Sequence, residues 1–284
     1  MKVLYILNES SFYMKLAWFS MASLRHYNPD IPVDVLLVRD GGRDSRDVAG
    51  RERLWLGIPD MDLEQFAHEA SSRFGAFPTL VADYEPGVEA GFPGAQRKEF
   101  SRVEGEEVLL LDADTFVLGE LGPLFSSPHD VMADRNTWTS FSGTDLDGTK
   151  SFNSGVVLFK KGLHREYGDS LHRLLARTRD DGTRDGRWMR EAERYWSERG
   201  YSGVRTGREE LAFCLWATER DSGQFGDREV QTINYRHPTR VFHTMTPYWL
   251  QNWPRFFDGP RFKPPRRMGR ILLPPGRSKK EKAS

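Results

Sequence analysis

The chain contains only one cysteine, Cys214, in 284 residues, no excess charge of either sign and no long apolar run. A single cysteine excludes an internal disulfide and any zinc site built from several thiolates. It fits a reducing compartment, and we expect a cytoplasmic protein. Lys plus Arg and Asp plus Glu number 41 each, so no overall positive field favours nucleic acid as a partner. The apolar stretch at residues 3–7 is too short for a signal peptide or a membrane span.

Strand-like and helical patterns alternate over most of the length, which predicts an α/β fold. The chain is long enough to bury one large core. A strand, helix, strand order at the start predicts a parallel pair. The strand candidates are residues 3–7, 33–38, 108–111, 156–159 and 240–242, and the helix candidates are residues 10–27, 62–74, 163–178 and 208–218.

Two carboxylates follow a short apolar run, in the order Val108-Leu109-Leu110-Leu111-Asp112-Ala113-Asp114-Thr115. Four apolar residues are too few for a helix and predict a strand buried on both faces. Ligands of α/β sheets collect beyond the carboxyl ends of such strands. Alternate residues of an extended chain point to one side, so Asp112 and Asp114 are expected to converge. Oxygen ligands of this kind suit Mn²⁺ or Mg²⁺.

Two further segments strengthen this interpretation. Asn153-Ser154-Gly155 precedes an apolar strand, where Gly155 would let the backbone approach a ligand and Asn153 offers both a donor and an acceptor. The plainer interpretation is an ordinary turn before a strand. His243 ends another short strand, and its imidazole is a suitable third ligand for Mn²⁺. A lone histidine there is more often a hydrogen-bonded structural residue.

The order of these three motifs, together with residues 5–24 and the following Asn28-Pro29-Asp30, resembles family 8 of the retaining glycosyltransferases. That family includes glycogenin-like and lipooligosaccharide galactosyltransferase-like enzymes, and its fold is called GT-A. The similarity runs over most of residues 1–250. It implies a Rossmann-like, mainly parallel central sheet flanked by helices. The implied division is a single domain at 1–257, with a donor half of about 1–160, an acceptor half of about 161–257 and a tail at 258–284.

The resemblance implies a metal-dependent transfer of a sugar from a nucleotide-sugar donor, usually UDP-linked, to an acceptor that it does not identify. Asp112, Asp114 and His243 match the residues that hold Mn²⁺, or Mg²⁺, on the donor diphosphate. The other implied donor-binding residues are Asn8 and Tyr13 for the nucleoside, Arg97 near the sugar and diphosphate, Asp134 for the sugar, and Asn153 and Ser154. Several of these are also ordinary polar residues of a loop or a helix surface.

The sequence departs from the family pattern in two places. After the histidine the family often has Gly and then Lys-Pro-Trp, whereas this chain reads Thr244-Met245-Thr246-Pro247-Tyr248-Trp249, without the lysine that contacts phosphate. Where the family opens a helix near the reacting centre with an Asp-Gln-Asp element, this chain has Glu209 and Glu210. Either carboxylate is a candidate to face the anomeric carbon. Acidic residues are also common at helix N-termini for electrostatic reasons alone.

Two other functions remain open at this point. The segment from Leu110 to Thr115 also matches the motif of haloacid-dehalogenase-like phosphatases, in which Asp112 would be the nucleophile, Asp114 the acid and base, and Mg²⁺ the cofactor. Those enzymes usually carry the motif on their first strand and need a later acidic pair, which Gly226-Asp227 does not supply. The third possibility is a sugar-nucleotide-binding protein without transferase activity.

The C-terminal segment differs in composition from the rest of the chain. Residues 261–284 contain nine Lys or Arg residues against the single Glu281, with several prolines. The simplest interpretation is a solvated tail. The alternative is a weak peripheral contact with an anionic membrane, because clustered cations beside a few apolar residues bind such surfaces.

Overall fold

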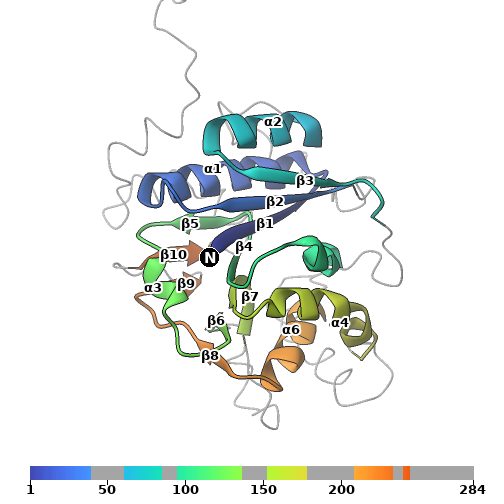
Figure 1. Cartoon of the computed structure of the whole chain (residues 1–284), viewed down its shortest axis with the longest axis vertical. Coiled ribbons are helices and arrows are strands. Elements are labelled where there is room, and N and C mark those ends of the chain that lie inside the picture. The colour runs from blue at the N-terminus through green and yellow to red at the C-terminus, as the bar shows by residue number, and fades with distance from the viewer. Residues whose placement is uncertain (40–60, 85–94, 136–151, 178–207, 233–238, 244–284) are drawn as a thin grey trace, which may run out of the picture.

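A seven-stranded sheet with helices on both faces forms the framework of the protein (Figure 1). The computed structural model describes residues 1–39, 61–84, 95–135, 152–177, 208–232 and 239–243. The strand order is β3-β2-β1-β4-β7-β6-β8. The strands are β1 (Lys2–Asn8), β2 (Val33–Val38), β3 (Phe77–Val81), β4 (Val108–Leu111), β6 (Val131–Arg135), β7 (Phe152–Phe159) and β8 (Ser222–Gln224).

The sheet is mostly parallel, as predicted. Strand β1 pairs in parallel with β2 and β4, β3 extends the sheet in parallel with β2, and β8 is parallel to β6. Among the described strands of this sheet, only β7 runs antiparallel to its neighbours, which are β4 and β6. The predicted parallel pair at the start of the chain is confirmed, and β4 is an inner strand of the sheet, with β1 on one side and β7 on the other.

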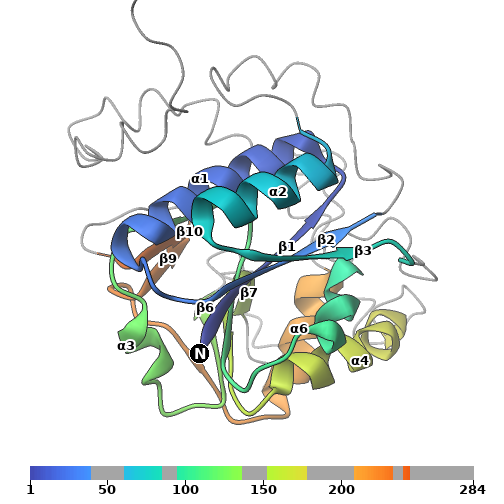
Figure 2. The same ribbon diagram turned by 45° about the horizontal axis from the view of Figure 1, so that its top comes forward.

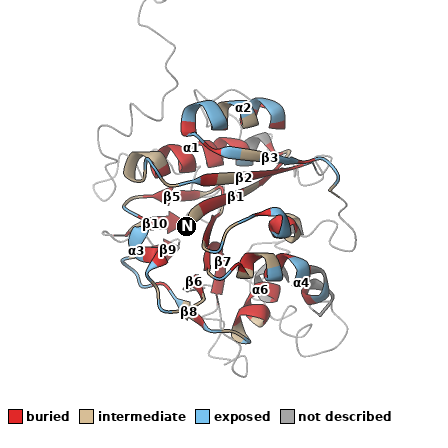
Figure 3. Ribbon diagram, in the orientation of Figure 1, coloured by how far each residue is buried: buried red, intermediate tan, exposed pale blue. Residues whose placement is uncertain are grey.

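Helices cover the sheet on both faces (Figure 2). On one face α1 (Ser11–Tyr27) lies beside α2 (Leu63–Phe74). On the other face are α4 (Leu163–Arg177), α6 (Arg208–Thr218) and the 3₁₀ segment η3 (Ala95–Arg102). The strands between them are largely buried (Figure 3). Two apolar cores result, one on each face, because alternate residues of a strand such as β1 point to opposite sides.

A smaller sheet of three strands, β5-β10-β9, lies beside the end of β4 (Figure 1). It consists of β5 (Thr115–Val117), β9 (Val230–Thr232) and β10 (Val241–His243). Strand β10 runs antiparallel to β5, with His243 opposite Thr115. This pairing returns the chain, more than 120 residues later, to the two aspartates after β4. A short helix, α3 (Gly122–Phe125), follows β5.

Two local predictions are wrong. Asn153-Ser154-Gly155 is not a turn before a strand, because these residues belong to β7, in which every residue is buried. Asp112 and Asp114 do not lie on an extended chain either. They lie in a tight turn between β4 and β5, closed by a hydrogen bond of 3.2 Å from Thr115 N to Asp112 O. The turn still leaves both carboxylates close to one point.

Several predicted regions lie outside the described residues, namely the tail at 258–284, residues 178–207 of the predicted acceptor half and the residues that follow His243. Within the described part of the chain, no helix is both long and apolar enough to cross a membrane.

Candidate active site

The turn that carries the two aspartates is held by backbone hydrogen bonds. Asp112 N donates to Gly155 O on β7 at 2.8 Å. Asp112 O accepts from Thr115 twice, from the backbone N–H at 3.2 Å and from the buried Thr115 hydroxyl at 2.8 Å. The position of the Asp112 backbone is therefore set by both sheets before any ligand binds.

Three potential ligands converge at this turn. His243 Nε2 lies 3.2 Å from Asp114 Oδ1 and 3.8 Å from Asp112 Oδ2. One ligand atom from each residue lies within 4.8 Å of the other two. The His243 side chain is buried, whereas 31% of the Asp112 side chain and 15% of the Asp114 side chain are exposed, so the cluster is open toward its carboxylates. Two carboxylate oxygens and one imidazole nitrogen suit a divalent cation such as Mn²⁺.

The His243 ring is oriented by Asn153. Its Nδ1 lies 3.0 Å from Asn153 Oδ1, which also accepts from Gly155 N at 2.9 Å. Because the backbone N–H donates to the same amide atom, that atom is the oxygen. The His243 Nδ1 therefore carries the proton, and in the neutral ring Nε2 presents its lone pair to the carboxylates.

Gly155 makes this arrangement possible sterically. A β-carbon at this position would lie 2.0 Å from His243 Cε1 and 2.6 Å from Nε2. The sequence predicted that Gly155 makes room for a ligand, but the space is filled by the His243 imidazole. The glycine thus makes room for the ring of a candidate metal ligand, and β7 passes close to that ring.

Opposing effects act on the charge of His243. Burial lowers its pKa, but the carboxylates of Asp114, Asp112 and Asp134 together outweigh burial and raise the pKa above its ordinary value. Without a cation the ring therefore keeps its second proton to a higher pH than an ordinary imidazole does. A metal bound at Nε2 must displace that proton.

Arg97 contributes a buried positive charge to the same place. It comes from η3, is 4% exposed, and its Nη2 lies 2.8 Å from Asp112 Oδ1. Sequence reasoning expected Arg97 near the donor sugar and diphosphate, and the structure pairs it directly with a candidate metal ligand.

The remaining predicted donor residues lie around this cluster or at the start of α1. Asp134 is buried on β6, opposite Asn153 on β7. Ser154, which follows Asn153 on β7, is also buried. Asn8 ends β1, and its Oδ1 accepts from Ser10 N at 3.3 Å. Tyr13 is 40% exposed near the start of α1.

The two glutamates of the predicted reacting centre are placed only by their backbone. Glu209 and Glu210 lie in the first turn of α6, and their side chains are outside the described part of the chain.

The sequence analysis did not identify Thr115, which has a clear part in the site. The Thr115 hydroxyl fixes the Asp112 carbonyl, and its position three residues after Asp112 is the spacing at which a turn closes.

No protein-family model and no curated protein sequence matches this chain. Solved structures do resemble it. The galactosyltransferase LgtC, in a complex with donor and acceptor sugar analogs, is 15% identical with a TM-score of 0.52, covering 95% of this chain and all of LgtC. The glycosyltransferase GlyE of Streptococcus pneumoniae TIGR4 is 16% identical with a TM-score of 0.52, covering 96% of this chain and 61% of GlyE.

A third similar structure is the bifunctional glycosyltransferase WbbM, which is 10% identical with a TM-score of 0.51 over 87% of this chain and 46% of WbbM. At such identities the likeness concerns the fold and does not carry substrate or chemistry with it. The mixed, mostly parallel sheet flanked by helices is the GT-A glycosyltransferase fold seen in LgtC.

Proposed function

We propose that this protein is a metal-dependent retaining glycosyltransferase that moves a sugar from a nucleotide-sugar donor, UDP-linked, to an acceptor still to be identified. The observation that carries the proposal is the convergence of Asp112, Asp114 and His243 at the end of β4. In a chain with the LgtC fold, this cluster lies where α/β sheets bind their ligands. LgtC itself was crystallised with donor and acceptor sugar analogs, which supports a donor of the same class.

Transfer of a sugar from a nucleotide-sugar donor requires a positive charge at the leaving diphosphate, and this site can supply one. A nucleoside diphosphate leaves readily only when its developing negative charge is met, and a bound divalent cation supplies that Lewis-acid stabilisation. Asp112, Asp114 and His243 would hold Mn²⁺, with Mg²⁺ as the alternative. The buried Arg97 guanidinium adds a positive charge at the same edge of the sheet.

The sugar and the nucleoside would be bound on either side of this cluster. Asp134, Asn153 and Ser154 from the neighbouring strands β6 and β7 offer hydrogen-bonding groups to the donor sugar. On the other side, Asn8 and the exposed ring of Tyr13 are suited to the ribose and the base, because an aromatic face stacks on a nucleobase.

Retention of configuration would involve the first turn of α6. A carboxylate from Glu209 or Glu210 near the anomeric carbon stabilises either a covalent glycosyl-enzyme or a short-lived oxocarbenium ion. In the second case the leaving phosphate takes the proton of the acceptor hydroxyl, which attacks from the same face. No separate general base is then required.

The phosphatase alternative has less support. Strands β1, β2 and β3 all precede β4 in the chain, whereas those phosphatases carry the motif on their first strand. In addition, a buried histidine beside both aspartates has no part in that mechanism, but it is a natural third metal ligand.

The test is calorimetric titration of the full chain with UDP, in Mn²⁺ and in EDTA, for the wild type, Asp114→Asn and Asp130→Asn. Asp130 is a matched control, since it pairs with Lys161 at the surface at 2.8 Å and lies outside the cluster. We expect binding that requires Mn²⁺, is lost in Asp114→Asn and is kept in Asp130→Asn. Absence of UDP binding under every condition would overturn the UDP-sugar proposal.

If UDP binds, a screen of UDP-sugars with product analysis by NMR distinguishes catalysis from binding alone. Donor hydrolysis or transfer that preserves the anomeric configuration supports the proposal. Binding without any turnover would favour the non-catalytic alternative, and release of phosphate from phosphomonoesters would favour the phosphatase.

A further inference from the structure

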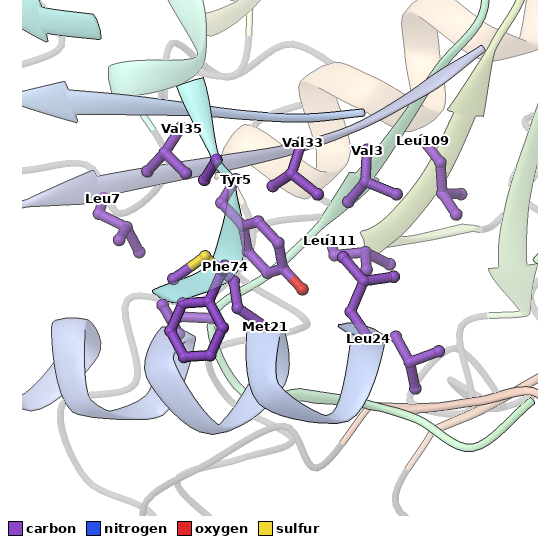
Figure 4. Close-up of a cluster of buried hydrophobic side chains, with 14 of the residues drawn as sticks. Val3, Tyr5, Leu7, Met21, Leu24, Val33, Val35, Phe74, Leu109 and Leu111 are labelled. Atoms are coloured by element: carbon purple, nitrogen blue, oxygen red, sulfur yellow. The ribbon is translucent and has the colours of Figure 1, made fainter. Parts of the chain in front are cut away.

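Three buried hydroxyls form a chain that leads through the core to the Asp112 turn. Tyr5 on β1, Ser20 on α1 and Thr115 on β5 are all fully buried. Tyr5 Oη lies 2.8 Å from Ser20 Oγ, and Ser20 Oγ lies 2.9 Å from Thr115 Oγ1. Thr115 Oγ1 then donates to Asp112 O at 2.8 Å. Figure 4 shows the Tyr5 side chain reaching from β1 toward α1.

The direction of these hydrogen bonds follows from the last acceptor. A carbonyl oxygen only accepts, so the single Thr115 hydroxyl proton is used on Asp112 O. Thr115 must then accept from Ser20, and Ser20 in turn must accept from Tyr5. Burial raises the pKa of Tyr5, which keeps the phenol protonated as the first donor. Such a one-way chain polarises each successive bond.

Packing alone does not require these hydroxyls. The surroundings of Tyr5 are apolar, with Val3, Leu7, Met21 and Leu24 in the same cluster (Figure 4). Phenylalanine would fill the same volume, but it could not donate to Ser20. Buried polar groups are costly unless they are paired, and here all three are paired with one another and end on the backbone of a candidate metal ligand.

Helix α1 also holds β5 at a second point. Ser23 Oγ accepts from Val117 N at 3.0 Å and donates to Ser20 O at 2.7 Å. The helix thus fixes the start of β5 through Ser20 and its end through Ser23. The turn between β4 and β5 is therefore attached to a rigid element that lies outside both sheets.

We infer that Tyr5, Ser20 and Thr115 are positioning residues for the metal cluster, acting through the Asp112 carbonyl. Orientation of the peptide after Asp112 determines where its carboxylate points relative to Asp114 and His243. This inference rests on the metal assignment made under the proposed function. It adds that metal affinity depends on buried hydroxyls of α1 and β1, which act on the cluster through the Thr115 hydroxyl and the Asp112 backbone.

The test is the Mn²⁺ affinity of the full chain without nucleotide, measured by electron paramagnetic resonance of free Mn²⁺. Thr115→Val keeps the shape but removes the hydroxyl, Thr115→Ser keeps the hydroxyl, and Ser20→Ala interrupts the chain one step earlier. We expect Thr115→Val and Ser20→Ala to weaken Mn²⁺ binding about threefold to tenfold, at the lower end of effects from indirect metal-site partners. Thr115→Ser should retain wild-type affinity.

Ser222→Ala is the matched control, because the buried Ser222 hydroxyl also donates to a backbone carbonyl, Ala217 O, at 2.6 Å. Ser222 belongs to β8, which is separated from β4 by β7 and β6 in the sheet order. This variant should lower the melting temperature without changing Mn²⁺ affinity.

If Thr115→Val is poorly folded, Tyr5→Phe is the alternative variant. It removes a single oxygen at the far end of the hydrogen-bond chain and should weaken Mn²⁺ binding about twofold.

Two results would contradict the inference in distinguishable ways. If the wild type binds Mn²⁺ and the Ser20→Ala and Tyr5→Phe variants bind it equally well, the positioning role is overturned but the metal assignment stands. Wild-type protein that binds no Mn²⁺ overturns the metal assignment, and the positioning role with it.

Discussion

Asn153 Oδ1 lies 3.0 Å from His243 Nδ1 and accepts from Gly155 N at 2.9 Å, so one amide oxygen links β7 to the ring of a candidate metal ligand. Imidazoles that bind metals usually donate their other N–H to a fixed acceptor, which sets the tautomer and the ring plane. Here that acceptor is itself fixed by the strand it belongs to. The Asn153 side chain, predicted to contact the donor, therefore also orients a residue of the candidate metal site.

Replacement of Asn153 should accordingly weaken metal binding before any donor is present. We expect Asn153→Ala to lower Mn²⁺ affinity about tenfold to a hundredfold, as is usual when the partner of a metal-binding histidine is removed. Titration of Mn²⁺ by paramagnetic resonance measures this directly. Asn28→Ala is the control, since Asn28 also uses its amide at both ends, donating to Gly119 O at 3.0 Å and accepting from Leu121 N at 2.8 Å. Equal Mn²⁺ affinity in Asn153→Ala and the wild type would contradict the supporting role.

Gly155→Ala should displace the His243 ring. The added β-carbon would lie 2.0 Å from His243 Cε1, so the imidazole must leave its position beside Asp114. Overpacking of this kind costs about 1–3 kcal/mol of folding free energy. We expect a lower melting temperature together with loss of Mn²⁺ binding.

Gly122→Ala separates the steric effect from the general effect of replacing a glycine. A β-carbon at Gly122, the first residue of α3, meets no atom of the described part of the chain within 4 Å. This variant should keep both the melting temperature and Mn²⁺ affinity. Unchanged Mn²⁺ binding in Gly155→Ala would show that His243 is not a ligand in its observed position.

Much of the fold could be predicted from local patterns. Strand β4 (Val108–Leu111) was predicted with its observed bounds, because polar residues flank its four apolar residues. Helix α2 was predicted at residues 62–74, where Asp62 and Gln65 form a capping box and Gly75 ends the helix with a φ of 56°.

Other elements lacked a readable local pattern. Strands of three residues, such as β5 and β9, are too short to show a period. The strand predicted at 240–242 lies within one residue of β10, but the sequence could not show its pairing with β5, which brings His243 to Thr115. Strand β3 carries the exposed Phe77 and Leu80, so it does not alternate as a half-buried strand does. Asn153-Ser154-Gly155 looked like a turn because polar residues rarely occupy a central strand without a functional reason.

Arg97 should affect metal and nucleotide binding in opposite directions. Its guanidinium lies 2.8 Å from Asp112 Oδ1, where it repels an incoming cation but attracts a diphosphate. We expect Arg97→Gln to raise Mn²⁺ affinity about threefold to tenfold and to lower UDP affinity at saturating Mn²⁺ by a similar factor. Arg102→Gln is the control from the same 3₁₀ segment, because Arg102 pairs with Asp83 and Glu99 instead. A loss of affinity for both ligands would contradict the repulsion and indicate a purely structural role.

His164 should make folding stability depend on pH below neutrality. The residue is fully buried, and its Nε2 donates to Val103 O at 2.8 Å. Among the described residues, Nδ1 has no hydrogen-bond partner. Burial lowers its pKa, so the folded protein resists protonation of a ring that the unfolded chain protonates near pH 6.5. Its contribution to stability is present above pH 6.5 and is lost as the pH falls toward and through the folded pKa.

The measurement is the free energy of unfolding in urea between pH 5 and 8, without metal, for the wild type, His164→Gln and His243→Gln. As the pH falls, the wild type should lose stability relative to His164→Gln, by at most about 1.4 kcal/mol per pH unit. Relative to His243→Gln, the wild type should instead lose stability as the pH rises. The raised pKa of His243 gives stability that is fully present below pH 6.5 and lost as the pH rises through the folded pKa. Difference curves that are flat for both variants would contradict the burial and charge effects assigned to these two rings.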